Sequence, residues 1–228
     1  MNFLNKFRIR KAWQKTAALL SLTSCFLLAA TPAFAHHALD GKTPSNFFEG
    51  FLSGLAHPII GLDHFAIVVS IGLLAAIHSQ GIFIPISFLL TAMLGTSLHL
   101  AGASIPGIEL LVTGSILLFG LLLVKLDRCK VKLLIGLAAI AGLLHGYAYG
   151  EAIFGAKMMP LLAYLAGFTV IQIVVSLIAF VIAKAILSRQ KLEQQAEKFR
   201  SAGFVIFGIG FAFFASQLVE ALLPLPNG

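Results

Sequence analysis

The stretch that decides the fold runs from residue 159 to residue 187 and reads MPLLAYLAGFTVIQIVVSLIAFVIAKAIL, with Lys184 as its only charged residue. A helix needs about 20 apolar residues to cross the hydrocarbon layer of a membrane, and this stretch is long enough to do so. It therefore predicts a transmembrane helix.

Five further apolar stretches lie on either side of it, and each is also near the length of a span. They cover residues 57–79, 82–103, 106–126, 131–150 and 201–223. Short turn-like segments such as His78-Ser79-Gln80-Gly81 separate the first stretches, and a long polar segment, 188–200, precedes the last and predicts a loop. The sequence thus predicts an all-α, polytopic membrane protein with six transmembrane helices.

Composition supports a membrane protein and excludes other classes. The 228 residues are 59% hydrophobic and 11% charged, whereas soluble domains average about 25% charged residues. Five of the 16 lysines and arginines lie within the first fifteen residues, and the eleven that remain face nine acidic residues. No basic surface for nucleic acid is therefore expected. The two cysteines, Cys25 and Cys129, are too few for a cysteine-rich metal site.

The first 35 residues have the three parts of a secretory signal. Residues 1–15 are basic, residues 17–30 form a short apolar stretch, and Ala33-Phe34-Ala35 supplies a small-x-small cleavage pattern. We therefore predict a signal peptide over 1–35 and a mature transmembrane domain over 36–228 that begins with His36 and His37. An uncleaved anchor helix is the alternative.

Basic residues predict the orientation, because loops rich in lysine and arginine stay in the cytoplasm. They gather between the third and fourth stretches and around the fifth and sixth: Lys125, Arg128, Lys130, Lys132, Lys184, Arg189, Lys191, Lys198 and Arg200. A cleaved signal places the mature N-terminus outside, and threading six spans from there puts the same two regions inside. We expect both mature termini to be extracytoplasmic and the protein to lie in a bacterial inner membrane.

Ionisable side chains within the spans are few, and each costs about 2.5–3.5 kcal/mol on insertion scales. With the predicted topology seven of them fall in the outer half of the membrane: His57, Asp63, His64, His99, Glu109, His145 and Glu151. We expect them to form a pocket near the extracytoplasmic surface, with interhelical hydrogen bonding or helix capping as the alternative reading.

The densest group is in the first stretch, where His57 and His64 are seven residues apart. In a continuous helix they share a face and stand about 10 Å apart along the axis, which predicts a column of histidines rather than one chelate. Pro58 suits a first turn, so the helix is expected to begin near His57. Asp63 is either a direct ligand or a partner that orients an imidazole. Such a donor set suits nickel or cobalt without selecting them over copper, zinc or iron.

Two motifs resemble those of a known family. His57-Pro-Ile-Ile-Gly61-Leu-Asp63-His64 is similar to the HPxxGxDH signature of the HupE/UreJ nickel permeases, and His145-Gly-Tyr-Ala-Tyr149-Gly-Glu151 resembles their HGxAHGxE motif. Tyr149 stands where the family often has a histidine, and the fifth stretch lacks the histidine common there. The resemblance implies uptake of nickel, or cobalt as the near alternative, and an indirect link to the maturation of hydrogenase or urease.

Several residues are accessory candidates. His36 and His37 are candidates to capture metal at the mature N-terminus, with an ordinary disordered terminus as the alternative. Gln172 is a candidate to line the path, and Tyr149 is a further accessory candidate. Glu109 is also explained by the helix dipole, which favours an acid in the first turn. For His99, a position at the membrane interface without a ligand role is an equally good explanation.

The sequence therefore predicts a permease, not an enzyme, with Ni²⁺ or Co²⁺ as transported ion, the lipid bilayer as surroundings and no permanently bound cofactor. It contains no Walker motif for ATP hydrolysis and no HExxH zinc motif. Two alternatives stay open. One is an intramembrane redox protein or enzyme that holds metal or haem, with His64 and His145 as axial ligands. The other is a metal sensor without transport.

Overall fold

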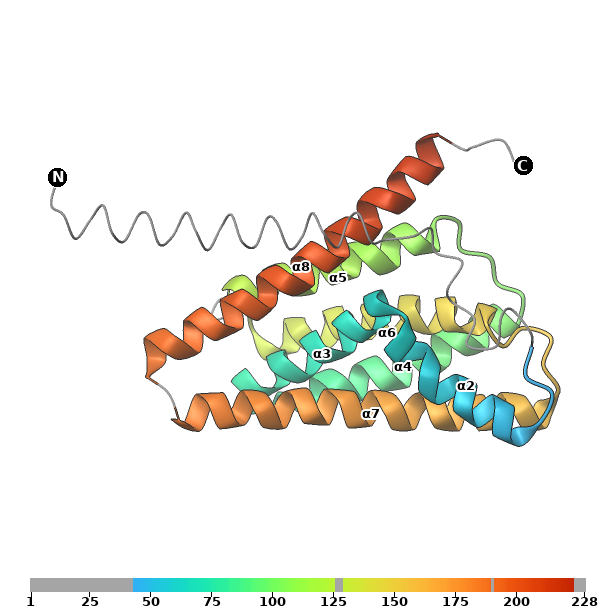
Figure 1. The fold of residues 1–228 in the computed structure, drawn as a ribbon, viewed down its shortest axis with the longest axis horizontal. Coiled ribbons are helices and arrows are strands. Elements are labelled where there is room, and N and C mark those ends of the chain that lie inside the picture. The colour runs from blue at the N-terminus through green and yellow to red at the C-terminus, as the bar shows by residue number, and fades with distance from the viewer. Residues whose placement is uncertain (1–42, 126–128, 190, 224–228) are drawn as a thin grey trace, which may run out of the picture. The chain divides into compact units, whose positions relative to one another are not determined.

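The computed structural model describes residues 43–125, 129–189 and 191–223, and all regular structure in these ranges is α-helical. The predicted signal peptide, His36 and His37 lie outside the described residues. The helices, shown in Figure 1, are α2 (Phe47–Ile60), α3 (Leu62–Ile77), α4 (Phe83–Leu100), α5 (Ile108–Lys125), α6 (Val131–Glu151), α7 (Met158–Arg189) and α8 (Leu192–Leu222).

Helices α4 to α8 are each long and apolar enough to cross a membrane, and α2 with α3 form a sixth span if the bent pair is counted as one. Many large apolar side chains on these helices face outward, for example Leu90, Ile140 and Leu177. A surface of this kind is unfavourable in water and favourable against lipid chains. The prediction of an all-α, polytopic membrane protein is confirmed.

The first predicted span is broken. α2 ends at Ile60, α3 begins at Leu62, and their axes differ by 78°. Gly61 between them is extended, with φ −72° and ψ 99°, and its N–H donates to the His57 carbonyl at 3.1 Å. The prediction of one continuous helix that starts near His57 is therefore wrong, because α2 begins at Phe47 and places Pro58 in its last turn.

The helices pack mainly in three pairs: α4 with α6, α5 with α8, and α7 with the broken pair α2 and α3. Glycines at these contacts let backbones approach. A Cβ at Gly120 of α5 would lie 2.6 Å from the Phe207 nitrogen of α8, and one at Gly146 of α6 would strike the Ala92 backbone of α4. Close packing of small residues replaces the hydrophobic drive that is absent between helices in lipid.

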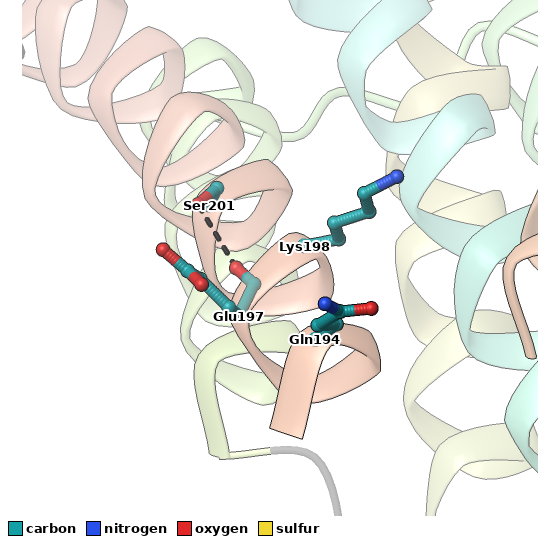
Figure 2. A pocket seen from close by; sticks show the side chains of 4 residues that line it. All are labelled: Gln194, Glu197, Lys198 and Ser201. Atoms are coloured by element: carbon teal, nitrogen blue, oxygen red, sulfur yellow. Dashed lines mark hydrogen bonds between the residues drawn. The ribbon is translucent and has the colours of Figure 1, made fainter. Parts of the chain in front are cut away.

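The polar segment 188–200 is not the loop that was predicted, because α8 already begins at Leu192. Gln, Glu, Lys and Ala fill most of 192–200 without glycine or proline, and these residues favour helix. Figure 2 shows the first turns of α8, where Gln194, Glu197, Lys198 and Ser201 line a pocket. Four of the basic residues that predicted the cytoplasmic side therefore belong to helices or their ends. Arg189 ends α7, Lys191 precedes α8, and Lys198 and Arg200 lie within α8.

Candidate metal centre

The break between α2 and α3 gathers a cluster of buried polar side chains, the candidate ion pocket. His57 in the last turn of α2 and Asp63 and His64 in the first turn of α3 are 5%, 6% and 3% exposed. The bend at Gly61 brings the rings of His57 and His64 to a centroid distance of 5.5 Å. The predicted column of two separate histidines is therefore wrong, since both rings line one pocket.

Asp63 is tied to its neighbour in two ways. Its Oδ1 accepts a hydrogen bond from the His64 backbone N–H at 2.8 Å, which satisfies one of the free N–H groups at the start of α3. Its Oδ2 lies 4.0 Å from Nε2 of the His64 ring. The carboxylate and one ring nitrogen are therefore close neighbours.

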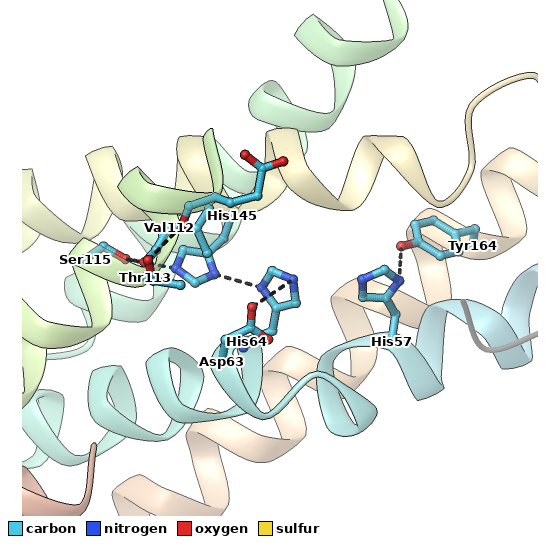
Figure 3. A network of polar contacts seen from close by, with 9 residues as sticks. His57, Asp63, His64, Val112, Thr113, Ser115, His145 and Tyr164 are labelled. Atoms are coloured by element: carbon cyan, nitrogen blue, oxygen red, sulfur yellow. Dashed lines mark hydrogen bonds and ion pairs between the residues drawn. The ribbon is translucent and has the colours of Figure 1, made fainter. Parts of the chain in front are cut away.

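The pocket extends to α6 and α5 through His145, which is fully buried. Its Nδ1 lies 2.9 Å from Nδ1 of His64, so the two rings are joined by a hydrogen bond. Its Nε2 lies 2.9 Å from Oγ of Ser115 in α5, and the Ser115 hydroxyl donates to the Val112 carbonyl at 2.6 Å. Figure 3 shows this chain of contacts across three helices.

Aromatic rings close the pocket. Tyr149 of α6 is fully buried, with its ring 4.3 Å from that of His64 and 5.1 Å from that of His57. On its other side it packs edge-on against Phe168 at 4.4 Å. Tyr164 of α7 places its hydroxyl 3.3 Å from Nδ1 of His57 and donates to the Tyr149 carbonyl at 3.3 Å.

Tyr164 was missed by the sequence analysis. A signal for it exists, because the chain has three tyrosines, and a phenol inside an apolar span needs a hydrogen-bond partner. Two of them, Tyr149 and Tyr164, line this pocket. The third, Tyr147, accepts from the Ile105 N–H and donates to the Ala103 carbonyl, which anchors the segment before α5.

The structure brings His57, Asp63, His64, His145 and Tyr149 together in one buried cluster. Gln172 of α7 is also buried. Its Nε2 donates to the Phe168 carbonyl at 3.2 Å. Within the described residues, its Oε1 and the Tyr149 hydroxyl have no hydrogen-bond partner.

Three predicted residues lie apart from the pocket. His99 of α4 is half-buried, and its ring contacts Tyr147 at 4.7 Å and Phe154 at 5.8 Å. Glu109 in the first turn of α5 and Glu151 at the end of α6 are exposed. In the described ranges, no three His, Cys, Asp or Glu side chains are gathered closely enough to hold a metal ion as they stand.

These features define a class of protein: a multi-pass helical membrane protein in which a bent helix pair buries imidazole and carboxylate groups. A family model described as "HupE / UreJ protein" matches residues 24–213. The chain belongs to the HupE/UreJ family, which confirms the resemblance carried by the two motifs.

The chain is also similar to the Protein HupE of Rhizobium leguminosarum bv. viciae. The two are 26% identical over 167 residues, which cover 71% of this chain and 82% of the relative. No solved structure matches. The family is associated with uptake of nickel or cobalt for hydrogenase or urease.

Proposed function

We propose that this protein is a permease that carries Ni²⁺, with Co²⁺ as the near alternative, across the bacterial inner membrane through the pocket at the α2–α3 break. The observation that carries the proposal is the burial of His57, Asp63 and His64 around one bend, in contact with His145. Groups that are costly inside a membrane are retained where they bind or conduct an ion. Membership of the HupE/UreJ family supports the same conclusion.

The first step is capture of the ion by His64 and Asp63. Their Nε2 and Oδ2 atoms are 4.0 Å apart, and two atoms bound to one ion at about 2.1 Å each lie at most about 4.2 Å apart. One ion therefore fits between them, with water completing its coordination. His57, on the other side of the break, is the next imidazole in reach of a small movement.

The break itself suits an ion path. Irregular backbone at membrane depth is tolerated where it lines a cavity, and broken helices present their ends to ions in many transporters. A site of few protein donors is also weak enough to release the ion, which transit requires. His99, Glu109 and Glu151 would then act on the extracytoplasmic side, before the pocket, and Gln172 within the path. His36 and His37 would collect ions at the mature N-terminus.

The haem alternative is disfavoured by the placement of His64 and His145. Their Nδ1 atoms are 2.9 Å apart, whereas two imidazoles on opposite faces of one iron have nitrogens about 4 Å apart, twice a bond of about 2 Å. The pair is therefore too close to take a porphyrin between its rings. A metal sensor without transport shares the same pocket and differs from a permease only in ion influx.

The test is uptake into vesicles that contain the purified protein and a nickel-sensitive dye. We expect His64→Ala and Asp63→Asn to abolish influx, because each removes one of the two closest donors. The matched control is His78→Gln, which removes a half-buried histidine at the end of α3 that lies outside the pocket. Equal influx in His64→Ala and wild type rejects the proposal, and binding without influx in wild type identifies a sensor.

Competition among Ni²⁺, Co²⁺, Zn²⁺ and Fe²⁺ in the same vesicles assigns the ion. We expect Co²⁺ to compete best with Ni²⁺, because these are the two ions with which the HupE/UreJ family is associated. The donor set by itself does not favour them over zinc or iron. Stronger inhibition by Zn²⁺ or Fe²⁺ would reject nickel as the preferred ion and leave the pocket assignment in place.

A further inference from the structure

The candidate ion pocket is closed to water on both sides. The side chains of His57, Asp63, His64 and His145 are all buried. An ion that arrives with its shell of water cannot reach these atoms while the helices stand in this arrangement. Binding and release therefore require a movement that opens a route to the pocket.

The route inward is long and apolar. From His64, α3 continues to Ile77, about 20 Å along its axis. Over that length it contributes to a buried apolar cluster that includes Ile67, Ile71 and Phe119. Opening this side requires many packed side chains to separate.

The route outward is short, and Tyr164 crosses it. This fully buried residue lies in the second turn of α7, about 9 Å along the axis from Met158, where the helix begins. Its hydroxyl is 3.3 Å from Nδ1 of His57 and 3.3 Å from the carbonyl oxygen of Tyr149. Figure 3 shows the tyrosine beside His57, at the opposite end of the polar network from Ser115.

The bond to the Tyr149 carbonyl joins two groups of helices. The broken pair α2 and α3 packs along α7, whereas α6 packs mainly with α4. The pocket lies on the seam between these groups, because His64 comes from the first and His145 from the second. Tyr164 belongs to the first group and the carbonyl to the second, so this hydrogen bond holds the seam together at the outer side of the pocket.

We infer that Tyr164 is the outer latch of the ion pocket: its hydroxyl holds α7 to α6, and an ion enters or leaves when this contact parts. The inference rests on the proposed function, in which the pocket is the ion site. Many transporters work by rocking one group of helices against another around a fixed site. A latch made of a hydrogen bond suits such a movement, because its net contribution to the closed arrangement is small.

Tyr149 offers a matched comparison within the same pocket. Its side chain is also fully buried, but in the part of the chain that the structure describes its hydroxyl has no hydrogen-bond partner. Tyr149→Phe removes a buried oxygen without breaking a bond across the seam. Tyr164→Phe removes the oxygen that makes one and keeps the ring that stacks on Phe168. A difference between the two variants therefore reports the latch rather than ring packing.

Labelling of a buried cysteine measures the opening. Ala92 of α4 is fully buried in the apolar cluster that contains Tyr149 and Tyr164. In a Cys129→Ser background, Ala92→Cys should therefore react with a water-soluble thiol reagent only when the seam opens, and the background alone gives the blank. In metal-free protein we expect Tyr164→Phe to speed this reaction about 3- to 10-fold, as for the loss of one hydrogen bond. Tyr149→Phe should leave the rate unchanged.

Two results of the labelling would overturn the inference: an unchanged rate in Tyr164→Phe, or an equal increase in both variants. A third comparison does not depend on either variant. Lys157 is exposed, so Lys157→Cys gives the rate of an open site. Equally fast labelling of Ala92→Cys in otherwise unchanged protein would show that the pocket is not closed and would also overturn the inference. Thermal unfolding shows whether each variant is folded.

Ni²⁺ exchange, followed by stopped flow, connects the latch with the ion. We expect Tyr164→Phe to speed binding and dissociation by a similar factor and to leave the Kd near that of wild type, because the ligands stay in place. A raised Kd with wild-type rates of binding would overturn the inference and indicate a damaged site. Faster labelling in Tyr164→Phe, together with no Ni²⁺ binding in wild type, would reject the proposed ion site and leave the latch in place.

Discussion

Tyr149 decides what kind of pocket this chain has. Its fully buried ring packs against the rings of both His57 and His64, at the position where the family motif often carries a histidine. A phenol is a poor ligand for nickel beside an imidazole. Within the described residues its hydroxyl has no hydrogen-bond partner, so the ring serves mainly as an apolar wall.

Replacing Tyr149 by a metal-binding residue should tighten the binding of Ni²⁺. We expect Tyr149→His to raise Ni²⁺ affinity by about tenfold, roughly 1.4 kcal/mol, because it adds an imidazole beside those of His57 and His64. Uptake should become slower, since a tighter site releases its ion less readily. Calorimetry and vesicle influx measure the two effects. The control is Tyr149→Phe, which keeps the ring without a nitrogen, and an equal gain in that variant would attribute the effect to packing.

At the scale of helices, the bend between α2 and α3 builds the pocket. Gly61 permits it because a side chain there would collide with the site: a Cβ would lie 2.9 Å from Cδ2 of His64 and 3.0 Å from Oδ1 of Asp63. The two half-helices pack along α7, where Gly54 and Gly72 leave room for its backbone. The pocket is therefore held by the packing of both halves against one long helix.

Gly61→Ala should displace the two ligands without unfolding the bundle. We expect influx to fall at least about tenfold and stability to fall by about 1–3 kcal/mol, the usual cost of overpacking. Gly136→Ala in α6 is the matched control, because a Cβ there meets nothing within 4 Å. Vesicle uptake and thermal unfolding of both variants are the measurements. Normal uptake in Gly61→Ala would contradict the role given to the break.

At the scale of the whole molecule, successive helices from α3 to α8 alternate in direction (Figure 1), and basic residues collect at one end of them. Lys125 ends α5, Lys130 precedes α6, Arg189 ends α7 and Lys191 precedes α8. Lys157, in the turn between α6 and α7, is at the opposite ends of these helices. The positive-inside rule predicts that the end with these four basic residues faces the cytoplasm.

Cysteine labelling tests this orientation. In a Cys129→Ser background, we expect Lys157→Cys to react with a membrane-impermeant thiol reagent added to intact cells. Lys191→Cys should react only after the membrane is permeabilised. Both lysines are exposed, so access to each depends on the side of the membrane. The reverse labelling pattern would place the metal pocket near the cytoplasmic surface and contradict the direction proposed for uptake.

The apolar stretches, their lengths and the rarity of charge within them determined the helical membrane fold from sequence alone, because each span must satisfy its own backbone. The motif from His57 to His64 likewise identified the family and most of the pocket. The local sequence pattern predicted the wrong helix bounds at Gly61 and at Leu192. At Gly61 a helix continuing through the glycine and a sharp bend are both compatible with the composition, and packing against α7 decides between them.

Only the tertiary structure decided how the polar groups meet. Nothing in the local pattern relates Ser115 to His145, 30 positions later, or His64 to His145, 81 positions later. Such contacts depend on which helix faces pack together and at what rotation. A hydrophobic pattern specifies that rotation weakly in lipid, because outward and inward faces are both apolar. For the same reason Tyr164 was overlooked, although its hydroxyl lies against His57.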